Sequence, residues 1–170
     1  MFHIEFKFED IEILSIEKQD LGNIYEWYVN EELEKGQCGN NSVCEKDFYE
    51  RFLEYYFSEC EFFLKINRKK NLIGIVKGRI EFKNPNKVWI TYIMVDHPLR
   101  GDGLGSKILN KVINYFVSEY GICKFYVKVG ENDEECIDFL KKNGFRIIRF
   151  TIEKSVSMSS SSFIIFSKTI

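Results

Sequence analysis

Residues 88–106 constrain the fold of this chain more than any other part of the sequence. They read VWITYIMVDHPLRGDGLGS: an apolar, β-prone run, a turn that contains Pro98, then Arg100 and three alternating glycines ahead of a helical pattern. Glycines let a ligand approach the backbone closely, and the N–H groups at a helix N-terminus point toward an anion. The segment therefore predicts a phosphate-binding turn between a strand and a helix, with Arg100 beside it.

Three alternative interpretations of this glycine turn agree less well with the sequence. A Walker A loop needs Gly-Lys-Ser/Thr, whereas the chain has Gly105-Ser106-Lys107. A Rossmann fold would use Glu131 as its ribose-binding acid, but the glycines follow G-x-G-x-G and too little chain remains for further β-α units. A tight turn without a ligand is the third alternative, and the arginine, the flanking elements and a later Gly-Phe pair disfavour it.

Composition predicts one globular domain over residues 1–170, in the cytoplasm. Hydrophobic content is 45%, and the net charge of −2 gives no basic field for nucleic acid. No apolar run approaches the roughly 18 residues of a membrane span. The cysteines are odd in number and lack a C-x-x-C pair, so we expect reduced thiols and no metal; they are Cys38, Cys44, Cys60, Cys123 and Cys136.

Hydrophobic periodicity and turn residues predict the order of elements. A loop is expected over 31–41, a capping box over 42–45, and a serine-rich loop or hairpin end over 155–162. Asp20 is expected to cap the first helix, and Asn132 or Asp133 the last. The expected strands are 2–8, 11–16, 61–66, 72–82, 88–95, 123–129, 145–151 and 163–169, and the main helices are 20–30, the segment after residue 45, 104–120 and the segment ending at 143. This order predicts an α+β fold: a central, mostly antiparallel sheet flanked by about four helices.

Two segments carry a family resemblance. Residues 95–106 show the spacing Arg100-x-x-Gly103-x-Gly105, and residues 132–145, NDEECIDFLKKNGF, form an asparagine-led helix that ends in Gly-Phe. Both segments, at this separation, resemble the landmarks of the GCN5-related N-acetyltransferase (GNAT) superfamily, and the resemblance spans roughly residues 60–150. It implies the GNAT fold and transfer of an acetyl group from acetyl-CoA to a primary amine.

The resemblance also implies how acetyl-CoA would bind. Backbone N–H groups of the turn would hold the pyrophosphate, with Arg100 supporting either the turn or the phosphate charge. Residues 93–95 would pair with the pantetheine arm like an added strand, and one of their N–H groups would stabilise the oxyanion. The implied cofactor-binding residues are Ile93, Met94, Val95, Arg100, Gly101, Gly103, Gly105, Ser106 and Asn132.

The catalytic groups depart from the family pattern. Many members place a tyrosine acid near the sulfur, and the matching position here is Leu140, which cannot donate a proton. Several members carry an acid on the central strand, where this chain has Thr91 and Tyr92. Tyr92 and Glu81 are therefore the candidate polar contacts at the reacting centre, each with a structural role as the alternative. His97 lies in the turn, and we interpret it as inert.

The resemblance implies that the first two helices and the loop between them select the acceptor. Aromatic and acidic residues gather there and suit a cationic amine such as an aminoglycoside or polyamine; they are Tyr25, Trp27, Tyr28, Glu31, Glu32 and Glu34. Alternatives are a protein N-terminal acetyltransferase, a non-catalytic acyl-CoA-binding module, and a helix whose acidic end is merely solvated. We expect a small-molecule or peptide acceptor, no nucleic-acid or membrane partner, and either a monomer or a homodimer.

Overall fold

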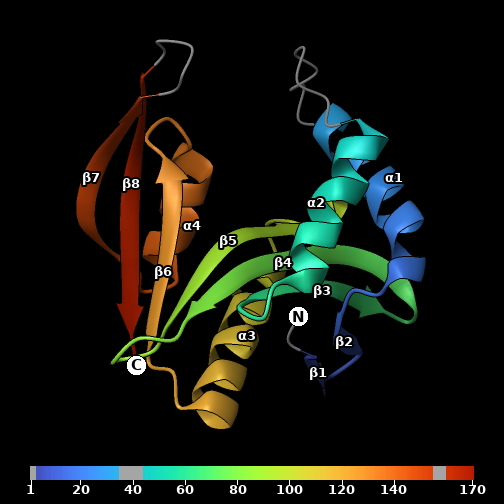
Figure 1. Ribbon diagram of the computed structural model, residues 1–170, viewed down its shortest axis with the longest axis horizontal. Helices are drawn as coiled ribbons and strands as arrows, with labels where there is room; N and C mark the ends of the chain where they lie inside the picture. The colour runs from blue at the N-terminus through green and yellow to red at the C-terminus, as the bar shows by residue number, and fades with distance from the viewer. Residues whose placement is uncertain (1–2, 35–43, 155–159) are drawn as a thin grey trace. The chain divides into compact units, whose positions relative to one another are not determined.

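The computed structural model describes residues 3–34, 44–154 and 160–170 (Figure 1). These residues form eight strands, four α-helices and two short 3-10 helices. In chain order they are β1 (Glu5–Phe8), β2 (Ile11–Ser15), η1 (Lys18–Asp20), α1 (Leu21–Glu34), α2 (Glu45–Phe57), β3 (Glu61–Arg68), β4 (Asn71–Glu81), β5 (Lys87–Val95), η2 (His97–Leu99), α3 (Leu104–Tyr120), β6 (Lys124–Gly130), α4 (Glu134–Lys142), β7 (Arg146–Lys154) and β8 (Ser160–Thr169).

The strands follow the order β1-β2-β3-β4-β5-β6-β8-β7 in one sheet. The β5–β6 pair is parallel, whereas β1–β2, β2–β3, β6–β8 and β7–β8 are antiparallel. This confirms the predicted α+β fold with its mostly antiparallel sheet. By its contacts the chain forms two compact units, unit 1 (Met1–Gly78 and Tyr92–Asp102) and unit 2 (Arg79–Thr91 and Gly103–Ile170). The single domain over residues 1–170 stays a prediction.

In unit 1, α1 and α2 lie side by side (Figure 1) and pack their apolar faces onto strands. The alternating apolar residues of β1 and β2 set the register of the hairpin, in which Phe6 faces Ile13. Side chains from both helices, from β3, β4 and β5, and from the residue after β2 form one buried cluster, which consists of Ile16, Leu21, Ile24, Phe52, Phe63, Ile75 and Met94. Burial of this cluster supplies the hydrophobic stabilisation that holds the helices on the strands.

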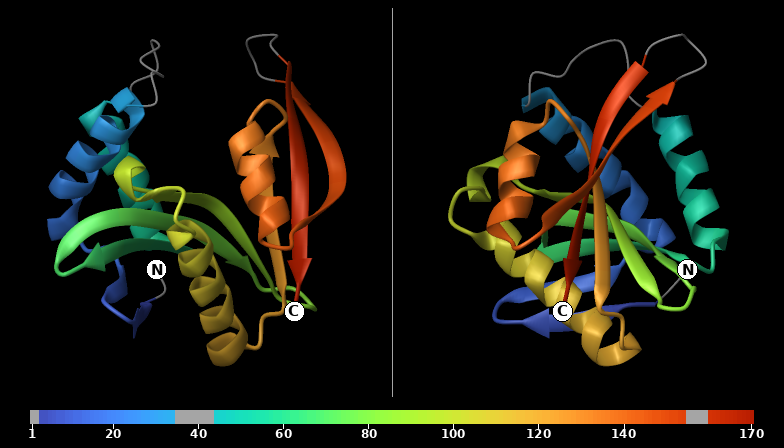
Figure 2. Two further views of the ribbon diagram at one scale, coloured as in Figure 1. Left: turned by 180° about the vertical axis from the view of Figure 1, so that it is seen from behind. Right: turned by 90° about the vertical axis from the view of Figure 1, so that its left-hand side faces the viewer.

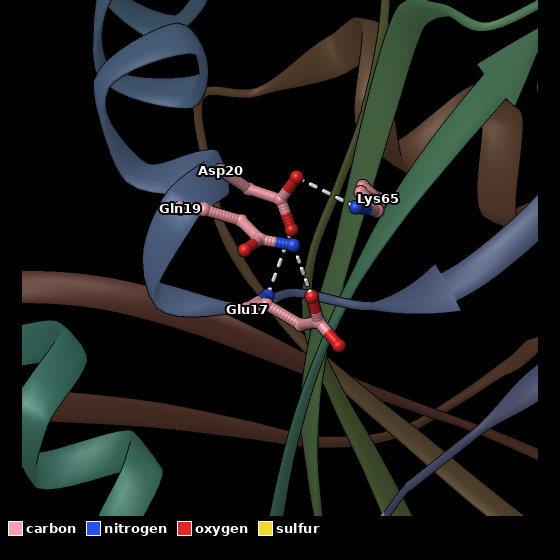
Figure 3. Close-up of polar contacts among 4 residues, drawn as sticks. All are labelled: Glu17, Gln19, Asp20 and Lys65. Carbon is pink, nitrogen blue, oxygen red and sulfur yellow. Dashed lines mark hydrogen bonds and ion pairs between the residues drawn. The ribbon is translucent and has the colours of Figure 1, made fainter.

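The entry into α1 is fixed by a polar network (Figure 3). Asp20 accepts the Glu17 N–H at 2.8 Å and forms an ion pair with Lys65 of β3, 2.6 Å from Nζ to Oδ1. Gln19 Nε2 donates to the Glu17 carboxylate at 2.5 Å. Asp20 thus closes a capping box around η1, whose N-cap is Glu17, and α1 begins at Leu21, directly after the predicted cap residue.

Two predicted loop boundaries in unit 1 were wrong. Helix α1 continues to Glu34 instead of ending near residue 30, because the predicted loop opens with strong helix formers. At α2 the N-cap is Cys44, whose Sγ accepts the Asp47 N–H at 3.5 Å. Ser42 of the predicted capping box lies outside the described residues, as does most of the expected loop over 31–41.

In unit 2, β6 pairs with β8, and β8 pairs with β7, with α4 alongside these strands (Figure 2). Strand β8 begins at Ser160, earlier than predicted, because 160–162 pair with the end of β7; residues 155–159 of the expected loop lie outside the described part. Helix α3 ends at Gly121, whose φ of 61° is left-handed. Asp133 caps α4 by accepting the Cys136 N–H at 3.1 Å, which settles the choice between Asn132 and Asp133.

Candidate active site

The carboxyl end of β5, in unit 1, is held by main-chain and side-chain contacts. The Asp96 N–H donates to the Ile73 carbonyl of β4 at 2.9 Å. Arg100 Nε donates to the Val95 carbonyl at 2.7 Å, and the Arg100 N–H donates to the His97 carbonyl at 3.1 Å. Arg100 therefore braces the turn that follows β5, which is the first of the two roles expected for it.

Beside this turn, β4 approaches β5 more closely than a side chain at residue 74 would allow. A Cβ built on Gly74 would lie 2.5 Å from the Met94 carbonyl oxygen and 3.3 Å from the Val95 Cα. The side chains of Met94 and Val95 are buried, and Ile93 is half-buried. Ile93, Met94 and Val95 stay the predicted pantetheine-binding segment.

The glycine turn that precedes α3 has left-handed backbone. Gly101 and Gly103 have φ of 95° and 79°, and a Cβ on either would meet nothing within 4 Å. Gly103 is the N-cap of α3, and its carbonyl accepts the first helical bond, from the Lys107 N–H at 3.0 Å. The N–H groups of the first helical turn, which includes Gly105 and Ser106, have no intrahelical partners and point out of the helix N-terminus. This is the geometry that a pyrophosphate needs.

Within unit 2, Ser106 is hydrogen-bonded to a residue that sequence reasoning missed as functional. Asn143, which is buried, donates from Nδ2 to Ser106 Oγ at 2.9 Å and to the Phe139 carbonyl at 2.8 Å. In the sequence, Asn143 was visible only as the residue at the end of the last predicted helix, and this position indicated no contact with Ser106. Asn132 is exposed in the turn ahead of α4.

The two candidate catalytic residues lie in different units. In unit 1, the Tyr92 hydroxyl donates to Met94 Sδ at 3.0 Å, at the same end of β5. In unit 2, the Glu81 carboxylate pairs with Arg79 at 3.2 Å and with Lys83 at 3.6 Å, so two cations compensate its charge. Leu140 is buried at 1% exposure, which fits an apolar packing role at the usual tyrosine position.

Aromatic rings from α1 and α2 gather next to Tyr92 in unit 1. The ring centroids of Tyr28 and Tyr92 are 6.3 Å apart, and Tyr28 and Tyr25 lie 6.4 and 5.4 Å from Phe48. These distances fall in the range where ring pairs attract each other. The Trp27 indole N–H donates to the Asp96 carboxylate. The side chains of Glu31, Glu32 and Glu34, expected in the same region, lie outside those described.

A lysine of β4 in unit 1 also faces aromatic rings. Lys77 Nζ lies 4.0 Å from the centroid of Tyr55 and 5.0 Å from that of Phe63. Burial lowers the pKa of Lys77 to about 8, while Glu61 opposes this shift and Arg51 adds to it. Sequence reasoning missed this residue, although a lysine inside the apolar run LIGIVKG was a visible signal.

The described part of the chain has neither a membrane-spanning helix nor a cluster of metal ligands. Its helices include none that is long and apolar enough to cross a bilayer. In the same residues, no group of three or more histidine, cysteine or acidic side chains could hold a metal ion. Cys44, Cys60 and Cys123 are free thiols, and Cys38 is outside the described residues.

The structure shows the strand order, the arginine and glycine turn at the N-terminus of α3, and the α4 helix that ends in Gly-Phe, which are the features of the expected protein class. The acetyltransferase (GNAT) domain family matches the chain over residues 13–157. The chain belongs to the GNAT acetyltransferase family. This confirms the family resemblance drawn from the sequence.

Similar proteins were found by sequence and by structure. N-alpha-acetyltransferase 50 of Danio rerio is 32% identical over 77 residues, 45% of this chain and 46% of that protein. The matched part of the chain thus spans about half the length of this curated relative. A spermidine N-acetyltransferase from Vibrio cholerae, in complex with CoA and spermine, has a TM-score of 0.74 at 15% identity and covers 94% of this chain and 95% of its own.

A ribosomal L7/L12 alpha-N-protein acetyltransferase in its apo form has a TM-score of 0.82 at 11% identity, and covers 100% of this chain and 96% of its own. A ribosomal-protein-S5-alanine acetyltransferase from Vibrio fischeri has a TM-score of 0.73 at 16% identity, over 98% of this chain and 96% of its own. At these identities the structures show a shared fold.

Proposed function

We propose that this chain transfers the acetyl group of acetyl-CoA to a primary amine, and that the amine is the N-terminus of a protein or peptide. The left-handed glycine turn that opens α3 carries the proposal for the donor. Its N–H groups hold the pyrophosphate, with Ser106 adding a hydroxyl donor. The backbone of residues 93–95 pairs with the pantetheine arm, as Gly74 keeps that end of β5 in place.

Acetyl-CoA supplies an acyl thioester that a neutral amine can attack. The nitrogen bonds to the carbonyl carbon, the C–S bond breaks, and CoA leaves as the thiolate while the nitrogen gives up a proton to water. A backbone N–H at the end of β5 stabilises the oxyanion. With leucine at residue 140, the thiolate departs without an acid from that position, which a thiol tolerates because its pKa is low. Tyr92 is the proposed polar contact for the amine, and Glu81 is the second candidate.

The aromatic rings of unit 1 support a peptide N-terminus as the acceptor. A peptide N-terminus brings one amine and an apolar side chain that can pack on aromatic rings. The match to an N-alpha-acetyltransferase supports the same acceptor class.

A small polycationic amine, such as a polyamine or an aminoglycoside, is the second candidate. The faces of Tyr25, Tyr28 and Phe48 attract cations, and α1 carries acidic residues along its sequence. These features support a cation of either kind, and the rate of acetyl transfer to each amine distinguishes the two acceptors.

Release of free thiol from acetyl-CoA tests the proposal. The full chain would be mixed with peptides that carry a free N-terminus, the same peptides already acetylated, spermidine and an aminoglycoside. We expect turnover with the free peptides, none with the blocked ones, and a reduced rate in Tyr92→Phe. Turnover with spermidine but not with the peptides would show that the acceptor is a small polycationic amine. Acetyl-CoA binding without turnover of any amine would favour the non-catalytic binding module instead.

A further inference from the structure

We infer that Asn143 is a positioning residue for the donor site: it orients the Ser106 hydroxyl so that its proton points at the pyrophosphate of acetyl-CoA. This inference rests on the proposed function, because it assumes that the N-terminus of α3 binds that pyrophosphate. All of the residues involved lie in unit 2.

Four residues from α3, α4 and β8 form one chain of hydrogen bonds. Lys168 Nζ donates to Asn110 Oδ1 at 3.2 Å, and Asn110 Nδ2 lies 3.5 Å from Asn143 Oδ1. Asn143 Nδ2 in turn donates to Ser106 Oγ at 2.9 Å. The chain starts at an ammonium group and ends at a hydroxyl in the first turn of α3.

The orientation of both amides in this chain is determined by their other partners. Asn143 Nδ2 uses its second proton on the Phe139 carbonyl at 2.8 Å, and Asn110 Nδ2 also donates to the Ser106 carbonyl at 2.9 Å. Turning either amide over would place its oxygen against a carbonyl oxygen. Because an amide nitrogen can only donate, Ser106 Oγ must accept from Asn143, and its own proton remains available for another acceptor.

Burial strengthens this arrangement. The Asn143 residue is 7% exposed, so its hydrogen bonds form in a medium of low dielectric constant, where successive bonds polarise one another. Every donor in the series points from Lys168 toward Ser106, and the series therefore raises the donor strength of the hydroxyl. The N–H groups at the N-terminus of α3 favour an anion at the same place.

A purely structural role for Asn143 is the competing explanation, since the residue also links the C-terminus of α4 to α3. The two roles differ in which ligand they affect. A positioning role through Ser106 weakens only ligands that carry the pyrophosphate, and it vanishes once the hydroxyl is gone. A structural role weakens any ligand of the domain and persists without the hydroxyl.

Titration calorimetry of the full chain with CoA and with pantetheine, which lacks the pyrophosphate, separates these roles. We expect Asn143→Ala to weaken CoA binding about tenfold, in line with one charge-assisted hydrogen bond, and to leave pantetheine binding unchanged. In the Ser106→Ala background, Asn143→Ala should have no further effect on CoA. Asn114→Ala, on the exposed side of α3, is the matched control and should bind CoA as the wild type does.

Equal losses for CoA and pantetheine, or an undiminished loss in the Ser106→Ala background, would overturn the positioning role while leaving the proposed function intact. A wild-type chain that bound neither CoA nor pantetheine would overturn the proposed function and the positioning role together. If Asn143→Ala does not fold, Lys168→Met tests the far end of the same series. It should weaken CoA about two- to threefold and leave pantetheine unchanged, and an unchanged CoA affinity would contradict the inference.

Discussion

The indole N–H of Trp27 donates a hydrogen bond to the carboxylate of Asp96, and this bond ties helix α1 to the residue that follows β5. The Asp96 main chain is bound separately, through its N–H to the Ile73 carbonyl at 2.9 Å. Asp96 thus connects the helix that we assign to acceptor selection with the end of the strand that we assign to the thioester. Its carboxylate is half-buried, so loss of its partner leaves a partly desolvated charge.

Trp27→Phe keeps an aromatic ring in place and removes this donor. We expect the free energy of unfolding to fall by about 1–3 kcal/mol, the usual cost of leaving a charged group without its hydrogen bond. Urea unfolding followed by far-ultraviolet circular dichroism measures the change. Asp96→Asn, whose amide oxygen can still accept from the indole, should cost less. A smaller loss in Trp27→Phe than in Asp96→Asn would show that the bond does not stabilise the fold.

Gly74→Ala tests the close approach of β4 to β5. The added Cβ would lie 2.5 Å from the Met94 carbonyl oxygen, and backbone there cannot move without shifting the strand. We expect a loss of about 1–3 kcal/mol in unfolding free energy, typical of overpacking, together with weaker acetyl-CoA binding.

The matched control for this substitution is Gly130→Ala in β6, because a Cβ there would meet nothing within 4 Å. It should keep both the stability and the acetyl-CoA affinity of the wild type. Equal behaviour of the two alanine variants in calorimetry and urea unfolding would contradict the close approach.

The glycines of the turn should respond differently to alanine. Gly103 has φ of 79°, so Gly103→Ala should cost about 1–2 kcal/mol in stability and weaken acetyl-CoA binding. Gly105 lies inside α3, and its Cβ would contact Phe139 at 3.4 Å, on the side of α4. Gly105→Ala should therefore keep the affinity and gain up to about 0.5–1 kcal/mol from helix propensity. Thermal unfolding and calorimetry on both variants measure these effects, and the reverse ranking would contradict the turn geometry.

Lys77 should make stability depend on pH in the alkaline range. Its pKa is lowered from 10.5 to about 8 by burial, so between these values the folded chain binds fewer protons than the unfolded chain. Stability therefore rises with pH across that window. Lys77→Met should raise the unfolding free energy near pH 7, by on the order of 2 kcal/mol, and lose this advantage as pH approaches 10.

Urea unfolding of the wild type and Lys77→Met at pH 7, 8.5 and 10 would trace this dependence. Lys142→Met, an exposed residue of α4, serves as the control and should follow the wild-type curve. A constant difference between the wild type and Lys77→Met at all three values would contradict the lowered pKa.

Local sequence signals predicted the parts of this molecule that local interactions decide. The alternation in β1 and β2, the apolar stripe of α3 and the glycine turn need only neighbouring residues, and the structure places each of them as expected. Asp133 begins α4 and Gly121 ends α3, each through bonds to nearby residues of the same helix. These signals also predicted the order of elements along the chain, whereas the order of strands within the sheet came from the structure.

Contacts between distant residues could not be predicted in this way. The Trp27–Asp96 bond joins residues 69 positions apart, and the Asn143–Ser106 bond joins residues 37 positions apart. Neither pair has a local pattern, because each forms only when separate elements pack together. Lys77 had a visible signal, a lysine in an apolar strand, but its lowered pKa depends on burial in the folded chain and on Glu61 of β3 and Arg51 of α2.

Binding of acetyl-CoA is the central claim, and thermal unfolding of the full chain with increasing acetyl-CoA tests it most directly. Nicotinamide dinucleotides and adenosine nucleotides serve as competing ligands. We predict that acetyl-CoA raises the melting temperature with concentration, by the equivalent of about 2.7 kcal/mol at a hundred times the dissociation constant. An unchanged melting temperature with acetyl-CoA, or an increase only with a dinucleotide, would contradict the proposed binding of acetyl-CoA.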